Sequence, residues 1–349
     1  MSKKARQKLN VLLLILIALG VATASPAETD SADPPTLKLA ASMYVGWMPW
    51  YLAAEDGTLE KEAEKAGLVI QFVADDYLET IQRFIEGKVH AVAITNIDAL
   101  GFVAGAGIAS DVILISSYSH GNDAILLRPE AEGDVTKGPI GLVEYSVSHY
   151  LLDRYLEREN LPHDAVQRRD ISEIEMVGHF QRENSDLLGV VTWNPMVSRL
   201  ENRFNVHNLF DSRFIEGEIA DMLLVRRDAL AEYPAFSDAL LGAWFNVMSR
   251  MRGPQKHETV KALSELSGTS PEDYERQLTT TLLIKTPEVG LGYLWDKSLR
   301  GVMVNVEAFV SQHMFVPNPP QKPWVSYAGE QPALLHFNDR PLQAFLDGQ

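Results

Sequence analysis

Residues 69–119 read VIQFVADDYLETIQRFIEGKVHAVAITNIDALGFVAGAGIASDVILISSYS, and this stretch carries the clearest fold pattern of the chain. Short apolar runs at 69–75, 90–95 and 111–119 are typical of buried strands, whereas 75–88 and 96–107 have helical patterning. Gly87 suits a helix C-cap, and Asn96 or Asp98 suits a helix start. Strands that alternate with helices in this way predict an α/β fold with mainly parallel sheets.

The alternation continues on both sides of this stretch. Upstream, 36–44 has a strand pattern and Trp50 to Gly67 has a helical one. Downstream, a second set of strands and helices begins near residue 138, and the apolar run 219–230 is expected to return to the first sheet. A chain of 349 residues exceeds one ordinary hydrophobic core. We therefore predict two lobes, with 36–127 and 222–349 in the first, 128–221 in the second, and two hinge crossings between them.

The first 27 residues have the order of a secretory signal peptide. Four basic residues precede the apolar run VLLLILIALGVA, and small residues follow it. We expect cleavage near Ala24 or Ala27 and export to the periplasm. The alternative is an uncleaved N-terminal anchor, although the run is short for a membrane span.

Composition excludes several classes of protein. The chain has no cysteine, which excludes disulfides, thiol catalysis, cysteine-bound metals and a lipid-anchored N-terminal cysteine. The net charge of −16 opposes binding to nucleic acid or to anionic lipid. We expect a protein that diffuses freely in its compartment.

Sequence motifs for catalysis are absent. The chain lacks a GxSxG elbow and a P-loop, and GAGIAS at 105–110 lacks the third glycine of a dinucleotide site. His257 and Glu258 lack the second histidine of a zinc helix, and the nine histidines show no metal-ligand spacing. We therefore expect no enzyme activity, no cofactor and no metal.

Polar and aromatic residues follow most of the predicted strands. Because ligands of open α/β sheets bind beyond the carboxyl ends of strands, we expect these residues to face one cleft. Each one alone could instead be a helix cap or a core residue. The candidate ligand-binding residues are Tyr44, Trp47, Asp75, Asn96, Asp98, Asn122, Asp123, Glu144, Ser146, Ser148, His149, Trp193 and Asn194. Asp76, Tyr77 and Thr95 lie at the same strand ends.

From about residue 37 to 252 the chain resembles the periplasmic substrate-binding proteins of ABC importers, in the nitrate, sulfonate and taurine group. It is most similar to the branch associated with urea carboxylase gene clusters. The resemblance rests on YVGWMPW (44–50), TNIDAL (95–100), GNDAI (121–125), VEYSVSHYLL (143–152), VVTWNP (190–195) and GEIADMLLV (217–225).

The resemblance implies a monomer with a two-lobed flytrap fold, which closes on a small ligand and docks on a membrane permease with its ATPase. For this branch it implies urea or a urea-like cargo such as guanidine. Anion sites favour Lys, Arg and helix N-termini, but the candidate residues include no Lys or Arg and several acids. Aromatic faces and carboxylates suit a planar cation, and we favour guanidinium.

Three alternatives stay open at this point. One is urea, which needs a hydrogen-bond donor to its oxygen. The second is a ligand of the taurine, sulfonate or nitrate type. The third is a different role on the same fold, either a pyrimidine-precursor synthase-like enzyme or a sensor for a membrane receptor.

Overall fold

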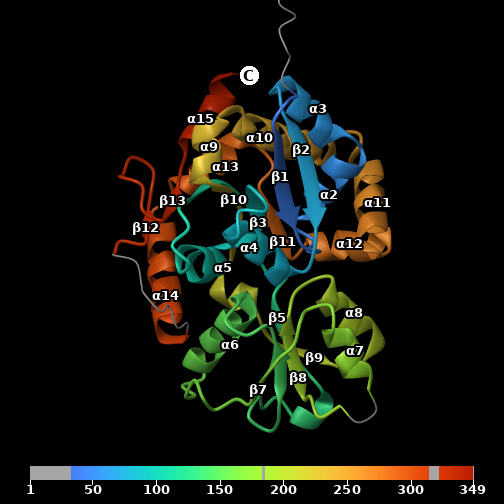
Figure 1. Ribbon diagram of the computed structural model, residues 1–349. Coiled ribbons are helices and arrows are strands. Elements are labelled where there is room, and N and C mark those ends of the chain that lie inside the picture. Colours follow the sequence, from blue (N-terminus) through green and yellow to red (C-terminus); the bar gives the residue numbers. More distant parts are fainter. Residues whose placement is uncertain (1–32, 183–184, 314–321, 349) are drawn as a thin grey trace, which may run out of the picture. The chain divides into compact units, whose positions relative to one another are not determined.

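The computed structural model describes residues 33–182, 185–313 and 322–348 (Figure 1), so the predicted signal peptide lies outside the described residues. The strands are β1 (Thr36–Ala41), β2 (Val69–Ala74), β3 (Ala91–Thr95), β4 (Ser110–Ser119), β5 (Ala124–Leu127), β6 (Ile140–Leu142), β7 (Arg168–Asp170), β8 (Gly189–Thr192), β9 (His207–Asp211), β10 (Ala220–Arg226), β11 (Thr281–Leu283), β12 (Val325–Ser326) and β13 (Leu335–Phe337). The helices are α2 (Met48–Glu55), α3 (Thr58–Lys65), α4 (Tyr77–Ile85), α5 (Asn96–Asp98), η1 (Ala99–Ala104), η2 (Pro129–Ala131), α6 (Val147–Arg158), α7 (Met176–Gln181), α8 (Met196–Arg203), η3 (Ser212–Ile215), α9 (Arg227–Glu232), α10 (Ala235–Arg252), α11 (Lys256–Ser267), α12 (Pro271–Leu278), α13 (Pro287–Leu294), α14 (Ser298–His313) and α15 (Arg340–Asp347). Among these helices, none is long and apolar enough to cross a membrane.

The first lobe consists of an eight-stranded sheet and the helices packed on it. Its strand order is β12-β13-β4-β10-β3-β1-β2, and β11 pairs with β4. Strand β1 is parallel to β2 and β3, as the sequence predicts. The return strand β10 lies between β3 and β4 and is antiparallel to both. The α/β fold is therefore confirmed, with one reversed strand at the centre of this sheet.

The second lobe is built on a five-stranded sheet in the order β7-β6-β8-β5-β9. Strand β6 is parallel to β7 and β8, whereas β5 is antiparallel to β8 and β9. Strand β5 spans Ala124–Leu127, which the sequence analysis placed at the end of the first lobe. The apolar pattern of β5 suits either sheet, and its pairing with β8 and β9 shows that it belongs to the second.

The chain connects the two sheets twice. Residues 120–123 lead from β4 to β5, and 216–219 lead from η3 to β10. Asn96 holds the second connection, because its side chain donates to the carbonyl oxygen of Glu218 (3.0 Å) and accepts from the backbone N–H of Ala220 (3.0 Å). The connections therefore pass directly beside the carboxyl ends of β3 and β4.

The single helix expected from Trp50 to Gly67 is in fact two helices, α2 and α3. Gly57 separates them with φ of 75°, a left-handed conformation that glycine adopts without strain. Asp56 then accepts hydrogen bonds from the backbone N–H and the hydroxyl of Thr58 at the start of α3. The break lets both helices pack against α10.

Candidate functional site

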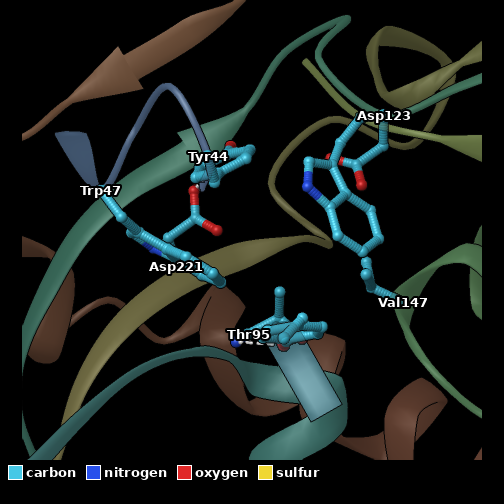
Figure 2. A pocket seen from close by; sticks show the side chains of 8 residues that line it. Tyr44, Trp47, Thr95, Asp123, Val147 and Asp221 are labelled. Atoms are coloured by element: carbon cyan, nitrogen blue, oxygen red, sulfur yellow. Dashed lines mark hydrogen bonds between the residues drawn. The ribbon is translucent and has the colours of Figure 1, made fainter. Parts of the chain in front are cut away.

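A narrow pocket, with about 10 Å³ open to the centre of a water-sized probe, lies where the two lobes meet (Figure 2). The first lobe contributes the loop after β1, the start of α4, the end of β3, and β10; the second contributes the start of α6 and the residue after β8. The first connection contributes Asp123. The lining residues are Tyr44, Trp47, Tyr77, Thr95, Asp123, Val147, Trp193 and Asp221. Four of the residues predicted from sequence are therefore together here: Tyr44, Trp47, Asp123 and Trp193.

Aromatic rings form a continuous wall along the pocket. The ring of Trp47 lies 4.8 Å from that of Tyr44 and 5.4 Å from that of Tyr77, measured between centroids. Tyr77 in turn meets Trp193 of the second lobe edge-on at 5.5 Å. Gly46 allows this approach, because a Cβ atom there would collide with the Tyr44 ring and lie 2.7 Å from Ser117 Oγ.

The other two rings of the aromatic turn have a structural role. Trp50 is fully buried and packs on Trp244 of α10 at 5.1 Å. Tyr51 donates its hydroxyl hydrogen to the carbonyl oxygen of Ala41. The turn therefore divides its rings between the pocket and the core.

Three acids are buried in and beside the pocket without a basic partner. Asp221 accepts hydrogen bonds from Tyr44 (2.9 Å) and Ser117 (2.6 Å). Figure 2 shows Asp221 beside Tyr44 and Trp47, with Asp123 and Val147 farther across the pocket.

The other two acids are bonded in the same way. Ser119 donates to Asp123 at 2.5 Å, and Asp98, just behind Tyr77, accepts from the Tyr77 hydroxyl at 2.5 Å. In the described part of the chain, no Lys, Arg or His forms an ion pair with these three acids. An ionised carboxylate in such a place is costly unless a cation joins it.

Burial changes the protonation of these acids. Loss of water raises the pKa of Asp221 to about 8, and the nearby charge of Asp123 adds to the effect. The same loss of water raises the pKa of Asp123 to about 7 and that of Asp98 to about 6. Hydrogen bonds from Ser117, Ser119 and Tyr77 oppose the shifts but do not cancel them. Near neutral pH, Asp221 and Asp123 therefore retain protons, which a cation bound between them would displace.

This protonation predicts a specific pH dependence of stability. The pKa of Asp221 is higher in the folded protein than in the unfolded chain. The contribution of Asp221 to folding stability is therefore present in full below about pH 4 and is lost as the pH rises through about 8. The side chain in Asp221→Asn cannot ionise. We therefore expect the melting temperature of the variant minus that of the wild type to increase between pH 5 and pH 8.5. Calorimetric melts of ligand-free protein measure this difference. Parallel curves for the two proteins would contradict it.

Two buried donors at the pocket have no protein partner. These are the indole N–H groups of Trp47 and Trp193, neither of which makes a hydrogen bond within the described residues. Both side chains line the pocket. A buried N–H without an acceptor is unfavourable, so a ligand or water that supplies an acceptor would be stabilised here.

Four predicted residues lie next to the pocket and shape it without lining it. Asp98 anchors Tyr77, and Asn96 holds the second connection as described above. Asn122 accepts from the backbone N–H of Asn194 at 2.9 Å, which joins the first connection to the loop after β8. Asn194 itself accepts from the backbone N–H and the hydroxyl of Ser198 in α8.

Five predicted residues lie outside the pocket. Asp75 pairs with Arg83 at 2.5 Å, and Glu144 pairs with Arg168 at 3.3 Å. Ser146 caps α6 by accepting from the backbone N–H of Ser148.

Ser148 and His149 follow this cap in the first turn of α6, and both are buried. Burial lowers the pKa of His149 to about 3, so its ring is neutral at pH 7.

The main residue that sequence reasoning missed is Asp221. Asp221 lies inside β10 rather than after a strand, so it is not among the residues that follow predicted strands. A lone acid in the apolar run IADMLLV was the available sign, because a buried strand rarely carries an acid without a reason. Tyr77 and Thr95 lie at predicted strand ends but are not among the candidate ligand-binding residues of the sequence.

Three solved structures illustrate the similarity of the fold, at 12–17% sequence identity. The periplasmic aliphatic sulphonate binding protein of Escherichia coli matches with a TM-score of 0.65 and 17% identity, covering 82% of this chain and 95% of that one. The periplasmic nitrate-binding protein of Synechocystis matches with a TM-score of 0.56 and 13% identity, covering 89% and 97%. A protein of Candida albicans, described as having the generic periplasmic binding protein structural fold, matches with a TM-score of 0.60 and 12% identity, covering 82% and 98%.

These likenesses establish the fold, which is that of the periplasmic binding proteins. No protein-family model and no curated protein sequence matches the chain. The comparisons include sulphonate- and nitrate-binding proteins, as the resemblance to their group predicted. The narrower branch associated with urea carboxylase stays a prediction.

Proposed function

We propose that the protein is the periplasmic solute-binding component of an ABC importer and that it captures a small planar cation of the guanidinium type. The observation that carries this proposal is the set of three buried acids, Asp98, Asp123 and Asp221, with no basic partner. Carboxylates accept the N–H groups of guanidinium in charge-assisted hydrogen bonds, and aromatic faces attract its charge. The protein works without catalysis, as a monomer that delivers its ligand to a membrane permease.

The pocket is narrow, since the space open to the centre of a water-sized probe is about 10 Å³, roughly that of one probe sphere. A ligand larger than a few non-hydrogen atoms does not suit it. The enclosing residues come from both lobes, so a ligand contacts both only when the lobes are together. Binding would then shift the population towards the closed arrangement.

A sulfonate or nitrate ligand fits this lining less well. The lining contains four aromatic residues and two acids, but no Lys or Arg. An anion would have to approach Asp123 and Asp221, whose charge would repel it whenever they are ionised. The likeness to sulphonate- and nitrate-binding proteins therefore supports the class of protein rather than the ligand.

Urea is the second candidate, and the unpaired indole N–H groups favour it. Trp47 and Trp193 each offer a donor that has no acceptor in the described residues. Urea has an oxygen to accept them, whereas guanidinium has none. Protonated Asp123 and Asp221 could also donate to a neutral ligand near pH 6.

Calorimetric titration of ligand-stripped protein tests the proposal. The panel contains guanidinium as a cation, urea as a neutral molecule, taurine as a zwitterion and nitrate as an anion, all at one ionic strength. We expect the tightest binding for guanidinium and none for nitrate. Tight binding of nitrate would contradict the cation site, and turnover of any ligand would contradict the non-enzymatic role.

The affinity for guanidinium should depend on pH. Because burial raises the pKa values of Asp123 and Asp221 to about 7 and about 8, binding of a cation must displace protons near neutrality. We expect affinity to rise at least about 10-fold between pH 6 and pH 8, since one displaced proton gives up to tenfold for each pH unit. Titrations in buffers of different ionisation enthalpy measure the protons released. A constant affinity, with no proton release, would contradict the role of these acids.

A further inference from the structure

A second cluster of titratable side chains lies away from the pocket, between α6 and the end of α14. It contains His149, Asp153 and His313, and one ligand atom from each lies within 4.8 Å of the others. We propose that this cluster is a binding site for a divalent transition metal, with Zn²⁺ the best match to its nitrogen and oxygen ligands. The sequence predicts no metal site, because the nine histidines show no metal-ligand spacing.

Helical spacing brings the first two residues together. His149 and Asp153 are one turn apart on α6, so their side chains lie on the same face of that helix. His313 is the last residue of α14, and its ring centroid lies 4.7 Å from that of His149. Its Nε2 atom lies 2.6 Å from Asp153 Oδ2. Ligand atoms of a tetrahedral Zn²⁺ site with bonds of about 2.0–2.1 Å are about 3.4 Å apart, so side-chain movements of up to about 1.5 Å would form the site.

The strongest sign of a binding site is the Nε2 atom of His149. The residue is 1% exposed, and this atom has no hydrogen-bond partner in the described structure. The edge of Phe309, at 5.3 Å, helps to fix the ring. Metal binding through Nε2 places the ring proton on Nδ1, so the long 3.3 Å contact with the backbone N–H of Tyr145 would be lost. A metal would satisfy a buried atom that the protein leaves unpaired.

His163 completes the surroundings of the site. Its Nδ1 atom lies 2.7 Å from Asp153 Oδ1, the oxygen that does not face His313. Outer histidines and carboxylates of this kind orient metal ligands. The site also joins the two lobes, because α6 packs on β8 and β5 of the second lobe, whereas α14 packs on α5 and η1 of the first.

Co²⁺ titration of the purified chain, made without a histidine tag and stripped with a chelator, tests the site in the absence of any solute. Co²⁺ bound to nitrogen ligands absorbs visible light. We expect these bands to saturate at one equivalent and to disappear when Zn²⁺ is added. Absence of the bands in the wild-type protein would overturn the proposal without recourse to any variant.

Three variants and a matched control locate the metal. His149→Gln and His313→Gln should each weaken Co²⁺ binding at least about 10-fold, whereas His163→Gln should have a smaller effect. His257→Gln alters an exposed histidine on α11 and should leave binding unchanged. Zn²⁺ should also raise the melting temperature of wild type but not of the first two variants. Unchanged Co²⁺ affinity in both His149→Gln and His313→Gln would overturn the assignment.

Discussion

Asp221→Asn should weaken guanidinium binding by at least about 30-fold, because loss of one member of a buried charge pair costs about 2–5 kcal/mol. The exchange preserves shape, and the remaining side-chain oxygen still accepts the hydrogen bonds of Tyr44 and Ser117. The ligand-free variant should stay folded, since a neutral amide avoids the cost of a buried charge. Calorimetric titration at pH 8 measures the affinity, and thermal melting checks the fold.

A matched exchange separates this effect from a general loss of structure. Asp111 is also a buried acid of the first sheet, on the neighbouring strand β4, but it pairs with Arg227 at 2.8 Å. Asp111→Asn should lower the melting temperature and leave guanidinium affinity unchanged. If the two variants lose affinity equally, Asp221 has no special role in the site.

Trp193→Ala should weaken binding by about 2–4 kcal/mol, which is at least about 30-fold, as expected for a buried aromatic contact at the centre of a site. Trp193 is the aromatic ring that the second lobe contributes to the pocket, and it meets Tyr77 of the first lobe. Its removal therefore takes away ring surface for the ligand and a contact between the lobes. Titration of the variant with guanidinium measures the loss.

Two further variants control this result. Trp193→Phe keeps an aromatic face but removes the indole N–H, so we expect it to retain most of the guanidinium affinity and to lose more of any urea affinity. Trp295→Ala changes a half-exposed tryptophan outside the pocket and should have no effect on binding. Wild-type affinity in Trp193→Ala would refute the proposed contact of the ligand with both lobes.

The fold was largely predictable because its strands and helices have clear periodic patterns. Residues 69–119 fold into the elements that their pattern indicates. Strand β5 could not be assigned, since a four-residue apolar run satisfies either sheet and its partners are distant in sequence. The dipeptide Asp56-Gly57 is a turn signal, but the helical patterning of 50–55 and 59–66 on either side of it concealed the break.

The site was predictable only in part, because a sequence does not show which charges pair. Asp75 and Glu144 follow strands as Asp123 does, but Arg83 and Arg168 lie within reach of them in the folded chain. Asp221 enters the pocket through the antiparallel insertion of β10 between β3 and β4, a pairing that no local pattern encodes. The aromatic residues were easier to find, because rings beside Gly46 and Pro49 are unusual in a turn.

The ratio of guanidinium to urea affinity, measured by calorimetric titration of the wild-type protein at pH 8, tests the central claim most directly. The two molecules have nearly the same shape and differ mainly in charge. The buried acids Asp98, Asp123 and Asp221 predict that guanidinium binds at least about 30-fold more tightly, a ratio that corresponds to about 2 kcal/mol. If urea binds as tightly or more tightly, these acids stay protonated in the complex, and the pocket is a site for a neutral ligand held by its indole N–H groups.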